Sequence, residues 1–259
     1  MFIPFIDAHL HPESRSQEDF ERLREAGCLG VAALAGGVGV YSEAVCLRDH
    51  FRRLADIDRE RVRKAGLKVF LGLGLHPAAL PAKGTDELLA DLPAILKVNG
   101  AAAVGEIGLE RADETERRVL RLQLDIAADA GLPAVVHTPR ADKRRVLEAT
   151  LDVLRQSRLP PGRVLLDHLD EETIDLAAGA GCALGLSVHP AKLTPTRAAS
   201  LVGSRPEARC LLSSDLGARP SWLFAVPAAI VAMQDAGVPD AIVRDAAAGR
   251  AAAFFFGAS

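Results

Sequence analysis

The chain has 259 residues, of which 49% are hydrophobic and 25% are charged, as in an ordinary globular protein. Its net charge of −3 argues against a surface coated in positive charge for bulk nucleic-acid or membrane binding, although a local basic pocket remains open. No window approaches the roughly 18–20 apolar residues of a membrane span, and residues 1–4 lack the basic region and cleavage site of a secretion signal. We therefore expect a cytoplasmic protein without a membrane partner.

The first apolar stretch, residues 5–11, carries Asp7, His9 and His11 at alternating positions. Because alternate side chains of a strand point to one face, we expect these three to project together, away from the apolar residues beside them. Two imidazoles and a carboxylate on one face form half of a metal site, because imidazole nitrogens suit zinc, iron, nickel and manganese-type ions. The remaining ligands must come from elsewhere in the chain.

Further apolar runs follow, most of them separated by stretches with a helical pattern. The expected strands span residues 29–35, 68–75, 102–109, 133–136, 163–167, 182–188 and 209–213. Helices are expected within residues 16–27, 41–65, 85–98, 113–130 and 140–157, ahead of residue 182, after Thr194-Pro195, and at the end of the chain.

Alternating strands and helices imply a parallel sheet with right-handed crossovers. Eight such units in about 250 residues favour an α/β fold of the (β/α)8 TIM-barrel type, with a doubly wound open sheet as the alternative. No shift of composition marks a linker, so residues 1–259 are expected to form a single domain.

Polar residues recur at the carboxyl ends of the expected strands. His76, Glu106, His137 and His168 follow one another at spacings of 30, 31 and 31 residues, one strand–helix unit each. Any one of them alone would be an ordinary loop or core residue, but the repetition is hard to assign to chance. The exception among the seven histidines is His50, which lies inside an expected helix and is predicted to be at the surface. Barrel enzymes place their catalytic groups at this end of the strands, so these side chains are expected to meet.

A site for two divalent ions follows from this placement. The two histidines of the first stretch would hold one ion, His137 and His168 would hold the other, and Glu106 would offer one oxygen to each. Asp215, after the last strand, would complete the shell of the first ion and could take a proton from the attacking water as general base. Glu106 and Asp215 are therefore the expected catalytic residues. Asp7 lies one alternate position deeper, where it is expected to support a ligand histidine or a basic neighbour.

The ordered motifs of the chain resemble those of TatD-type metal-dependent hydrolases of the amidohydrolase superfamily, over nearly its whole length. The motifs are Asp7-Ala8-His9-Leu10-His11, Leu75-His76-Pro77, Gly105-Glu106-Ile107-Gly108-Leu109, Val136-His137-Thr138-Pro139-Arg140, Asp167-His168 and Ser214-Asp215. The resemblance implies a two-metal barrel hydrolase, and members of this family are associated with phosphodiester hydrolysis, including DNase activity. The ligands it implies are His9, His11, Glu106, His137, His168 and Asp215.

Three segments depart from the pattern of TatD-type nucleases. His168 is followed by residues 169–172 (LDEE) where the family usually has a Cys/Phe/Ser/Gly run. Asp215 is preceded by two serines where the family usually has Glu-Thr, and the closing Asn-Ala motif is replaced by residues 249–251 (GRA). The resemblance therefore carries over better for the metals than for the substrate, and it indicates a TatD-related branch.

Basic residues surround the expected mouth of the barrel. Arg140 and Lys143 follow His137, Lys192 follows His189, and His76 lies at the same mouth. Arginine and lysine suit phosphate or carboxylate recognition, although the first two could instead be the solvated start of a helix. Basic residues at a helix N-terminus are not favoured by its dipole, which gives the functional interpretation weight. The five residues other than His137 are the expected substrate contacts.

Aromatic residues make up 4% of the chain, which leaves little for a base-stacking platform. A small phosphorylated substrate or a nucleic-acid end is therefore expected over long nucleic acid. Three functions stay open: a two-metal phosphoester hydrolase, an amide or lactone hydrolase using the same metals, and a metal-binding barrel that has lost its reaction. The full set of candidate ligands counts against the last. Zinc is the expected ion, with manganese and magnesium as alternatives.

Overall fold

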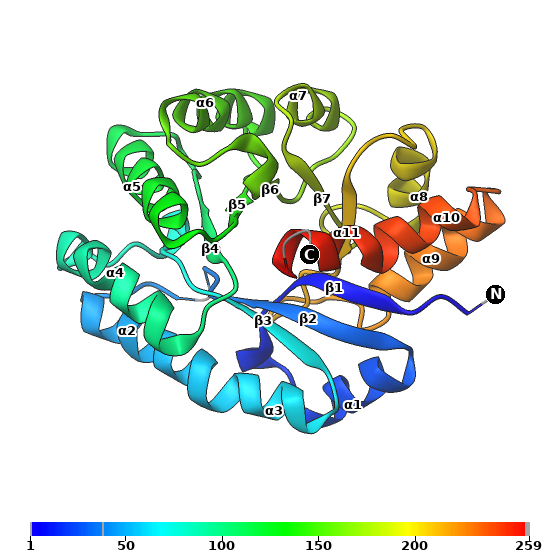
Figure 1. Ribbon diagram of the computed structural model, residues 1–259, viewed down its shortest axis with the longest axis horizontal. Coiled ribbons are helices and arrows are strands. Elements are labelled where there is room, and N and C mark those ends of the chain that lie inside the picture. Colours follow the sequence, from blue (N-terminus) through cyan, green and yellow to red (C-terminus); the bar gives the residue numbers. More distant parts are fainter. Residues whose placement is uncertain (1, 38, 257–259) are drawn as a thin grey trace.

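The computed structural model describes residues 2–37 and 39–256. Within these residues, eight strands form a ring around which helices make an outer layer (Figure 1). The strands are β1 Phe5–Leu10, β2 Cys28–Leu34, β3 Lys68–Gly72, β4 Val104–Gly108, β5 Ala134–His137, β6 Val164–Leu166, β7 Ala183–Ser187 and β8 Cys210–Ser213. Neighbouring strands within each sheet pair in parallel, as the alternating pattern predicted.

The ring of strands is closed. Regular pairing joins consecutive strands into two sheets, one of β1, β2 and β3 and the other of β4, β5, β6, β7 and β8. The two junctions between these sheets are made by isolated parallel bridges. One bridge joins Gly72 to Ala103, and the other joins Leu10 to Leu216. At the second junction the His11 N–H donates to the Leu216 carbonyl at 2.8 Å. The predicted (β/α)8 barrel is confirmed, and the open sheet is wrong.

The helices lie close to their expected positions. They are α1 Gln17–Glu25, α2 Ala44–Arg53, α3 Arg59–Lys64, α4 Thr85–Asn99, α5 Glu114–Ala130, α6 Lys143–Gln156, α7 Ile174–Gly179, α8 Pro195–Gly203, α9 Ala225–Asp235, α10 Asp240–Arg244 and α11 Arg250–Phe256. Ser16 and Asp19 form the capping box that begins α1. Helix α6 begins at Lys143 rather than at residue 140, because Asp142 has a left-handed backbone that a helix does not accept. No helix in the described part of the chain is long and apolar enough to cross a membrane.

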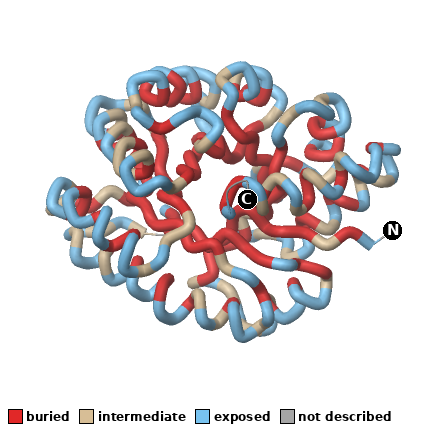
Figure 2. Tube along the Cα trace, viewed as in Figure 1, coloured by how far each residue is buried: buried red, intermediate tan, exposed pale blue. Residues whose placement is uncertain are grey.

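The barrel interior is apolar below the polar site, and α11 packs against it. Inward-facing residues such as Val135 and Leu165 form one cluster with Phe254 and Phe255 of α11. The Phe255 ring stacks on Phe70 of β3 with centroids 5.2 Å apart. In Figure 1, α11 lies over the ring of strands, and Figure 2 shows buried strands within a shell of partly exposed helices. This arrangement leaves the carboxyl ends of the strands for the polar residues.

The alternation predicted for β1 is wrong. Ile6 and Ala8 belong to the interior cluster, but Leu10 belongs to the layer between the strands and the helices. The pairing of β1 with β2 shifts its register between Asp7 and Leu10, as in a β-bulge. Because such a shift re-aims the side chains beyond it, Asp7 and the two histidines that follow do not share one face.

Candidate metal centre

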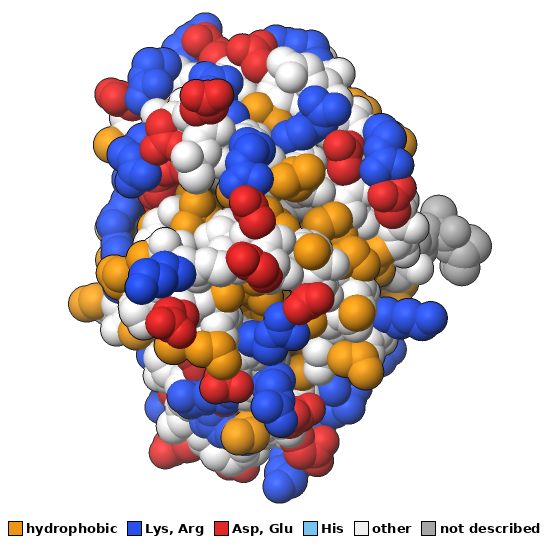
Figure 3. Space-filling model, turned by 90° about the vertical axis from the view of Figure 1, so that its left-hand side faces the viewer, with side chains coloured by type: hydrophobic (Ala, Val, Ile, Leu, Met, Phe, Trp, Pro, Cys, Tyr) orange, Lys and Arg blue, Asp and Glu red, His pale blue; other side chains and the backbone are white. Residues whose placement is uncertain are grey.

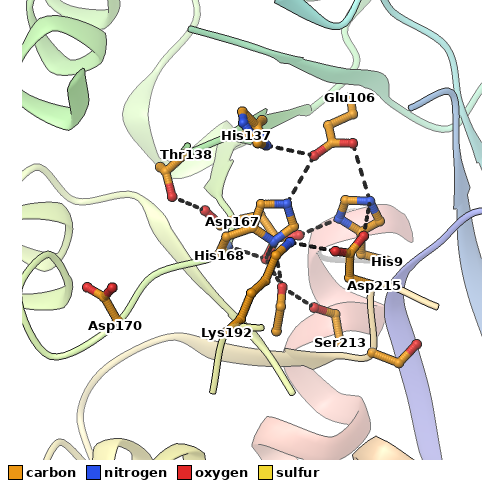
Figure 4. Close-up of polar contacts among 12 residues, drawn as sticks. His9, Glu106, His137, Thr138, Asp167, His168, Asp170, Lys192, Ser213 and Asp215 are labelled. Carbon is orange, nitrogen blue, oxygen red and sulfur yellow. Dashed lines mark hydrogen bonds and ion pairs between the residues drawn. The ribbon is translucent and has the colours of Figure 1, made fainter. Parts of the chain in front are cut away.

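Glu106, in the middle of β4, lies between two groups of histidines (Figure 4). Its Oε1 lies 3.2 Å from His137 Nδ1 and 3.1 Å from His168 Nε2. Its Oε2 lies 3.4 Å from His9 Nε2 and 3.8 Å from His11 Nε2. The bridging carboxylate therefore turns one oxygen to each group, and both groups are buried at the carboxyl ends of the strands.

The first group brings two imidazole nitrogens face to face. His9 Nε2 and His11 Nε2 are 3.1 Å apart, and Asp215 Oδ1 lies 3.7 Å from the former and 3.3 Å from the latter. The Nδ1 atoms bond to acceptors, Asp167 Oδ2 at 2.6 Å for His9 and the Leu34 carbonyl at 3.0 Å for His11. Each Nδ1 therefore carries a proton, which leaves each Nε2 with a lone pair in the neutral ring. Two lone pairs and two carboxylates around one point fit a bound cation.

The second group lies on the other side of the bridging carboxylate. Ser187 Oγ donates to Asp167 Oδ1 at 3.1 Å and is 2.7 Å from His168 Nδ1, so it accepts the proton of that nitrogen. His168 Nε2 is thus free to bind a cation. His137 presents Nδ1 instead, because its Nε2 lies 2.9 Å from Glu110 Oε1. His137 Nδ1 and His168 Nε2 thus both face Glu106 Oε1, and donors of these types can bind a divalent cation.

The charges of the centre balance only when a cation or proton is present. Burial tends to raise the pKa of Glu106, but the facing His9 and His76 outweigh it and hold this pKa well below its usual range. Burial tends to lower the pKa of His9, but Glu106 and Asp167 outweigh it and raise this pKa well above its usual value. A divalent cation among these side chains would satisfy the same carboxylates while leaving the imidazoles neutral.

The backbone around the ligands is built for close approach. A Cβ at Gly36 would lie 2.1 Å from His11 Cε1, and a Cβ at Gly185 would lie 2.3 Å from Asp167 Oδ1, so only glycine fits at either position. Two candidate ligands have positive φ, 62° at His168 and 49° at Asp215. Such strained backbone in non-glycine residues is typical of functional sites.

The structure brings three of the five expected substrate contacts to the centre. His76 Nε2 lies 3.8 Å from Glu106 Oε2, and Lys192 Nζ lies 2.5 Å from Asp215 Oδ2. The His189 carbonyl accepts from the Lys192 N–H at 2.9 Å, so His189 belongs to the loop that carries this lysine to Asp215.

The other two expected contacts lie farther out. Lys143 Nζ pairs with Asp170 Oδ2 at 2.8 Å, and Arg140 is exposed. Both line a surface depression of about 470 Å³ that also contains acidic residues. Lys143 is therefore engaged by a carboxylate of its own rather than free for a ligand. His50, expected at the surface, is half-buried in α2, with its ring centroid 6.2 Å from that of Tyr41.

Asp7 contacts a candidate ligand through the backbone N–H of His9 rather than through its imidazole. Its carboxylate accepts from the Ser214 N–H at 2.9 Å, the Ser214 hydroxyl at 2.5 Å and the His9 N–H at 3.3 Å, and so fastens β1 to the end of β8. The carboxylate that holds the imidazole of His9 is Asp167, which the sequence reasoning missed. Its position directly before His168 at a strand end was an available signal. Glu110, which holds His137, gave none, because it lies in a loop.

A closed barrel with buried histidines and carboxylates at its carboxyl end has a candidate metal site where barrel enzymes carry their active sites. The family described as TatD related DNase matches residues 6–220, and the chain belongs to this family. The predicted resemblance is therefore confirmed.

Individual relatives agree with the family. An uncharacterised metal-dependent hydrolase of Methanocaldococcus jannaschii is 33% identical over 236 residues, covering 91% of this chain and 93% of its own. The crystal structure of a TatD-like protein from Archaeoglobus fulgidus superimposes with a TM-score of 0.83 and 27% identity, over 97% of this chain and 100% of the other. The phosphotriesterase homology protein of Escherichia coli, solved with phosphate in its active site, has a TM-score of 0.77 and 16% identity, over 98% of this chain and 99% of the other. At that identity the likeness shows the fold alone.

Proposed function

We propose that this metal-dependent hydrolase binds two divalent ions, with zinc as the favoured metal, and hydrolyses a phosphoester. The observation that carries the proposal is the orientation of the Glu106 carboxylate, whose two oxygens face two different groups of imidazoles. Two ions held there would activate a water molecule and offset the negative charge that builds up on the substrate. Hydrolysis adds this water across the P–O bond, so that its oxygen joins phosphorus and the ester oxygen leaves as an alcohol.

Asp215 is the proposed proton acceptor for the attacking water. Its Oδ1 faces the first imidazole pair, and its Oδ2 bonds to Lys192 Nζ at 2.5 Å. Burial tends to raise the pKa of Asp215, but Lys192 and His11 outweigh it and hold this pKa well below its usual range. Lys192 therefore keeps the carboxylate in the ionised form that a general base requires, while lowering its basicity.

The charge near the mouth supports an anionic substrate of limited size. Lys192 lies beside Asp215, and the exposed Arg140 and Arg219 act on His189 electrostatically together with it. On the face shown in Figure 3, acidic and basic side chains are interspersed with hydrophobic ones, and no broad basic surface is visible there. Positive side chains near the mouth favour an anionic substrate, and we propose a small phosphorylated molecule or a nucleic-acid end rather than long nucleic acid.

The test is a panel of phosphomonoesters, phosphodiesters, lactones and amides, assayed with the zinc- and manganese-loaded protein and with Asp215→Asn. We expect turnover of a phosphoester that falls by about 100-fold or more in the variant. The exposed Asp152→Asn, on the outer face of α6, serves as the matched control and should keep wild-type activity. Turnover of lactones or amides alone would replace the proposed reaction, and turnover of nothing with either metal would contradict it.

A further inference from the structure

The same tripeptide, His-Pro-Ala, follows two different strands. Residues 76–78 lie beyond the end of β3, and residues 189–191 lie beyond the end of β7. Four positions separate these strands in a ring of eight, so the two segments lie on opposite sides of the barrel mouth, with the candidate metal centre between them.

Each segment folds back on its own imidazole. The Ala78 N–H donates to His76 Nδ1 at 3.0 Å, and the Ala191 N–H donates to His189 Nδ1 at 3.1 Å. A backbone N–H can only donate, so Nδ1 of each ring is an acceptor without a proton. In a neutral imidazole the proton must then sit on Nε2.

This tautomer is the opposite of the one found at three candidate ligands, His9, His11 and His168. His9 and His11 direct Nδ1 at oxygen acceptors and turn an Nε2 lone pair to the centre. His76 turns an Nε2–H to the same centre. His76, Glu110 and His137 lie close enough to suggest a further metal position, with one ligand atom of each within 4.8 Å of the others. The tautomer argues against that position, because a protonated Nε2 donates a hydrogen bond and does not bind a metal.

Neither Nε2–H has a hydrogen-bond partner among residues 2–37 and 39–256. His76 Nε2 lies 3.8 Å from Glu106 Oε2, beyond hydrogen-bonding distance. His76 is 6% exposed and His189 is 4% exposed, but neither Nε2 is among the fully buried unpaired atoms of residues 2–37 and 39–256, so each Nε2–H reaches solvent at the barrel mouth. A donor that opens to the mouth and has no protein partner can donate its hydrogen bond to a bound molecule.

We propose that His76 and His189 are neutral hydrogen-bond donors to the substrate, each fixed as the Nε2–H tautomer by its own His-Pro-Ala turn. Only the identity of the bound group, an oxyanion such as a phosphoryl group, rests on the proposed function. His76, beside the bridging carboxylate, faces an oxygen at the reacting centre. His189, in the field of Lys192, Arg140 and Arg219, faces a second oxygen or anionic group nearer the mouth.

The first test reads the tautomers directly. Nitrogen-15 imidazole spectra of the zinc-loaded protein distinguish Nε2–H from Nδ1–H, and the variants His76→Gln and His189→Gln assign the two signals. We expect Nε2–H at both residues and Nδ1–H at His11. A signal from His76 or His189 in the Nδ1–H form would overturn the proposal, whatever the enzyme hydrolyses.

The second test measures binding of inorganic phosphate to the zinc-loaded protein by calorimetry. Glutamine keeps an N–H near the position of Nε2, whereas leucine removes it. We expect His76→Leu and His189→Leu to weaken phosphate binding by about tenfold or more, and the glutamine variants by no more than about threefold. His50→Gln, in helix α2, is the matched control and should bind as the wild type does.

These outcomes separate the two claims. If the leucine variants bind phosphate as tightly as the wild type, the donor proposal is overturned even when the enzyme hydrolyses phosphoesters. If no phosphoester is hydrolysed but the predicted differences in phosphate binding are found, the proposed function fails and the two donors stand.

Discussion

Glu106 is the residue on which the two halves of the centre depend, since each of its oxygens faces a different imidazole group. Replacing it by glutamine leaves one carbonyl oxygen and puts an N–H₂ donor where a ligand is needed. We expect Glu106→Gln to lower the metal content from about two ions per chain to about one or fewer, measured by plasma mass spectrometry. Glu148→Gln, exposed on α6, is the control. Unchanged metal content in Glu106→Gln would contradict the bridging role.

Asp7 provides a pH-dependent test of the structure. Burial raises its pKa from 3.8 to about 6, against the hydrogen bonds from Ser214 that lower it. Between these two pH values the folded state binds more protons than the unfolded state. The stabilising contribution of Asp7 to the free energy of unfolding is therefore fully present below pH 3.8 and is lost as the pH rises through about 6. Relative to Asp7→Asn, the wild type should lose about 3 kcal/mol of unfolding free energy across this range. Urea denaturation at several pH values measures it, and a flat or rising difference would refute the assignment.

The sequence predicted the candidate ligands better than their supports. Glu106, His137 and His168 could be found because, with His76, one such residue recurs at the end of each successive strand–helix unit. Contacts between units have no such period, so the position of Asp167 at a strand end marked it as a candidate without showing that it holds His9. Asp7 was assigned to the face of the histidines because strict alternation was assumed, and a local register shift in β1 breaks that alternation.

The backbone after β2 lies against the ring of His11, a candidate ligand that follows β1. Gly36 follows β2, and a Cβ there would meet the ring of His11 at 2.1 Å. We expect Gly36→Ala to displace that ring and to weaken zinc binding by about tenfold or more, in a competition assay with a chromophoric chelator. Gly39→Ala is the matched control, because a Cβ there would meet nothing within 4 Å. Equal zinc affinity of the two variants would show that His11 does not bind the ion.

Helix α11 packs against the apolar interior of the barrel. Its sequence did not predict this contact, because a short run of Ala and Phe does not show which surface it covers. The ring of Phe255 is 7% exposed and stacks on Phe70, whereas Phe256 is 62% exposed. We expect Phe255→Ala to lower the free energy of unfolding by about 3 kcal/mol, and Phe256→Ala by about 1 kcal/mol or less. Chemical denaturation measures both, and equal effects would contradict the packing of α11.

Over the whole molecule, the residues that stabilise the barrel and the residues of the candidate site lie at different levels of the ring. Apolar residues and α11 fill the lower part of the ring, and the histidines and carboxylates gather at the carboxyl ends of the strands. The number and type of the strand–helix units could be predicted because each has its own hydrophobic pattern and turn. The closing contacts between β1 and β8 join residues more than 200 positions apart (Asp215 N–H to His9 O, 3.0 Å), and only the fold brings them together.

The most direct test of the two-ion centre is anomalous X-ray scattering from crystals of the zinc-loaded protein, collected on both sides of the zinc absorption edge. We predict two peaks separated by the Glu106 carboxylate, one among His9, His11 and Asp215 and the other beside His137 and His168. A single peak, or peaks that lie away from Glu106, would contradict the proposed centre.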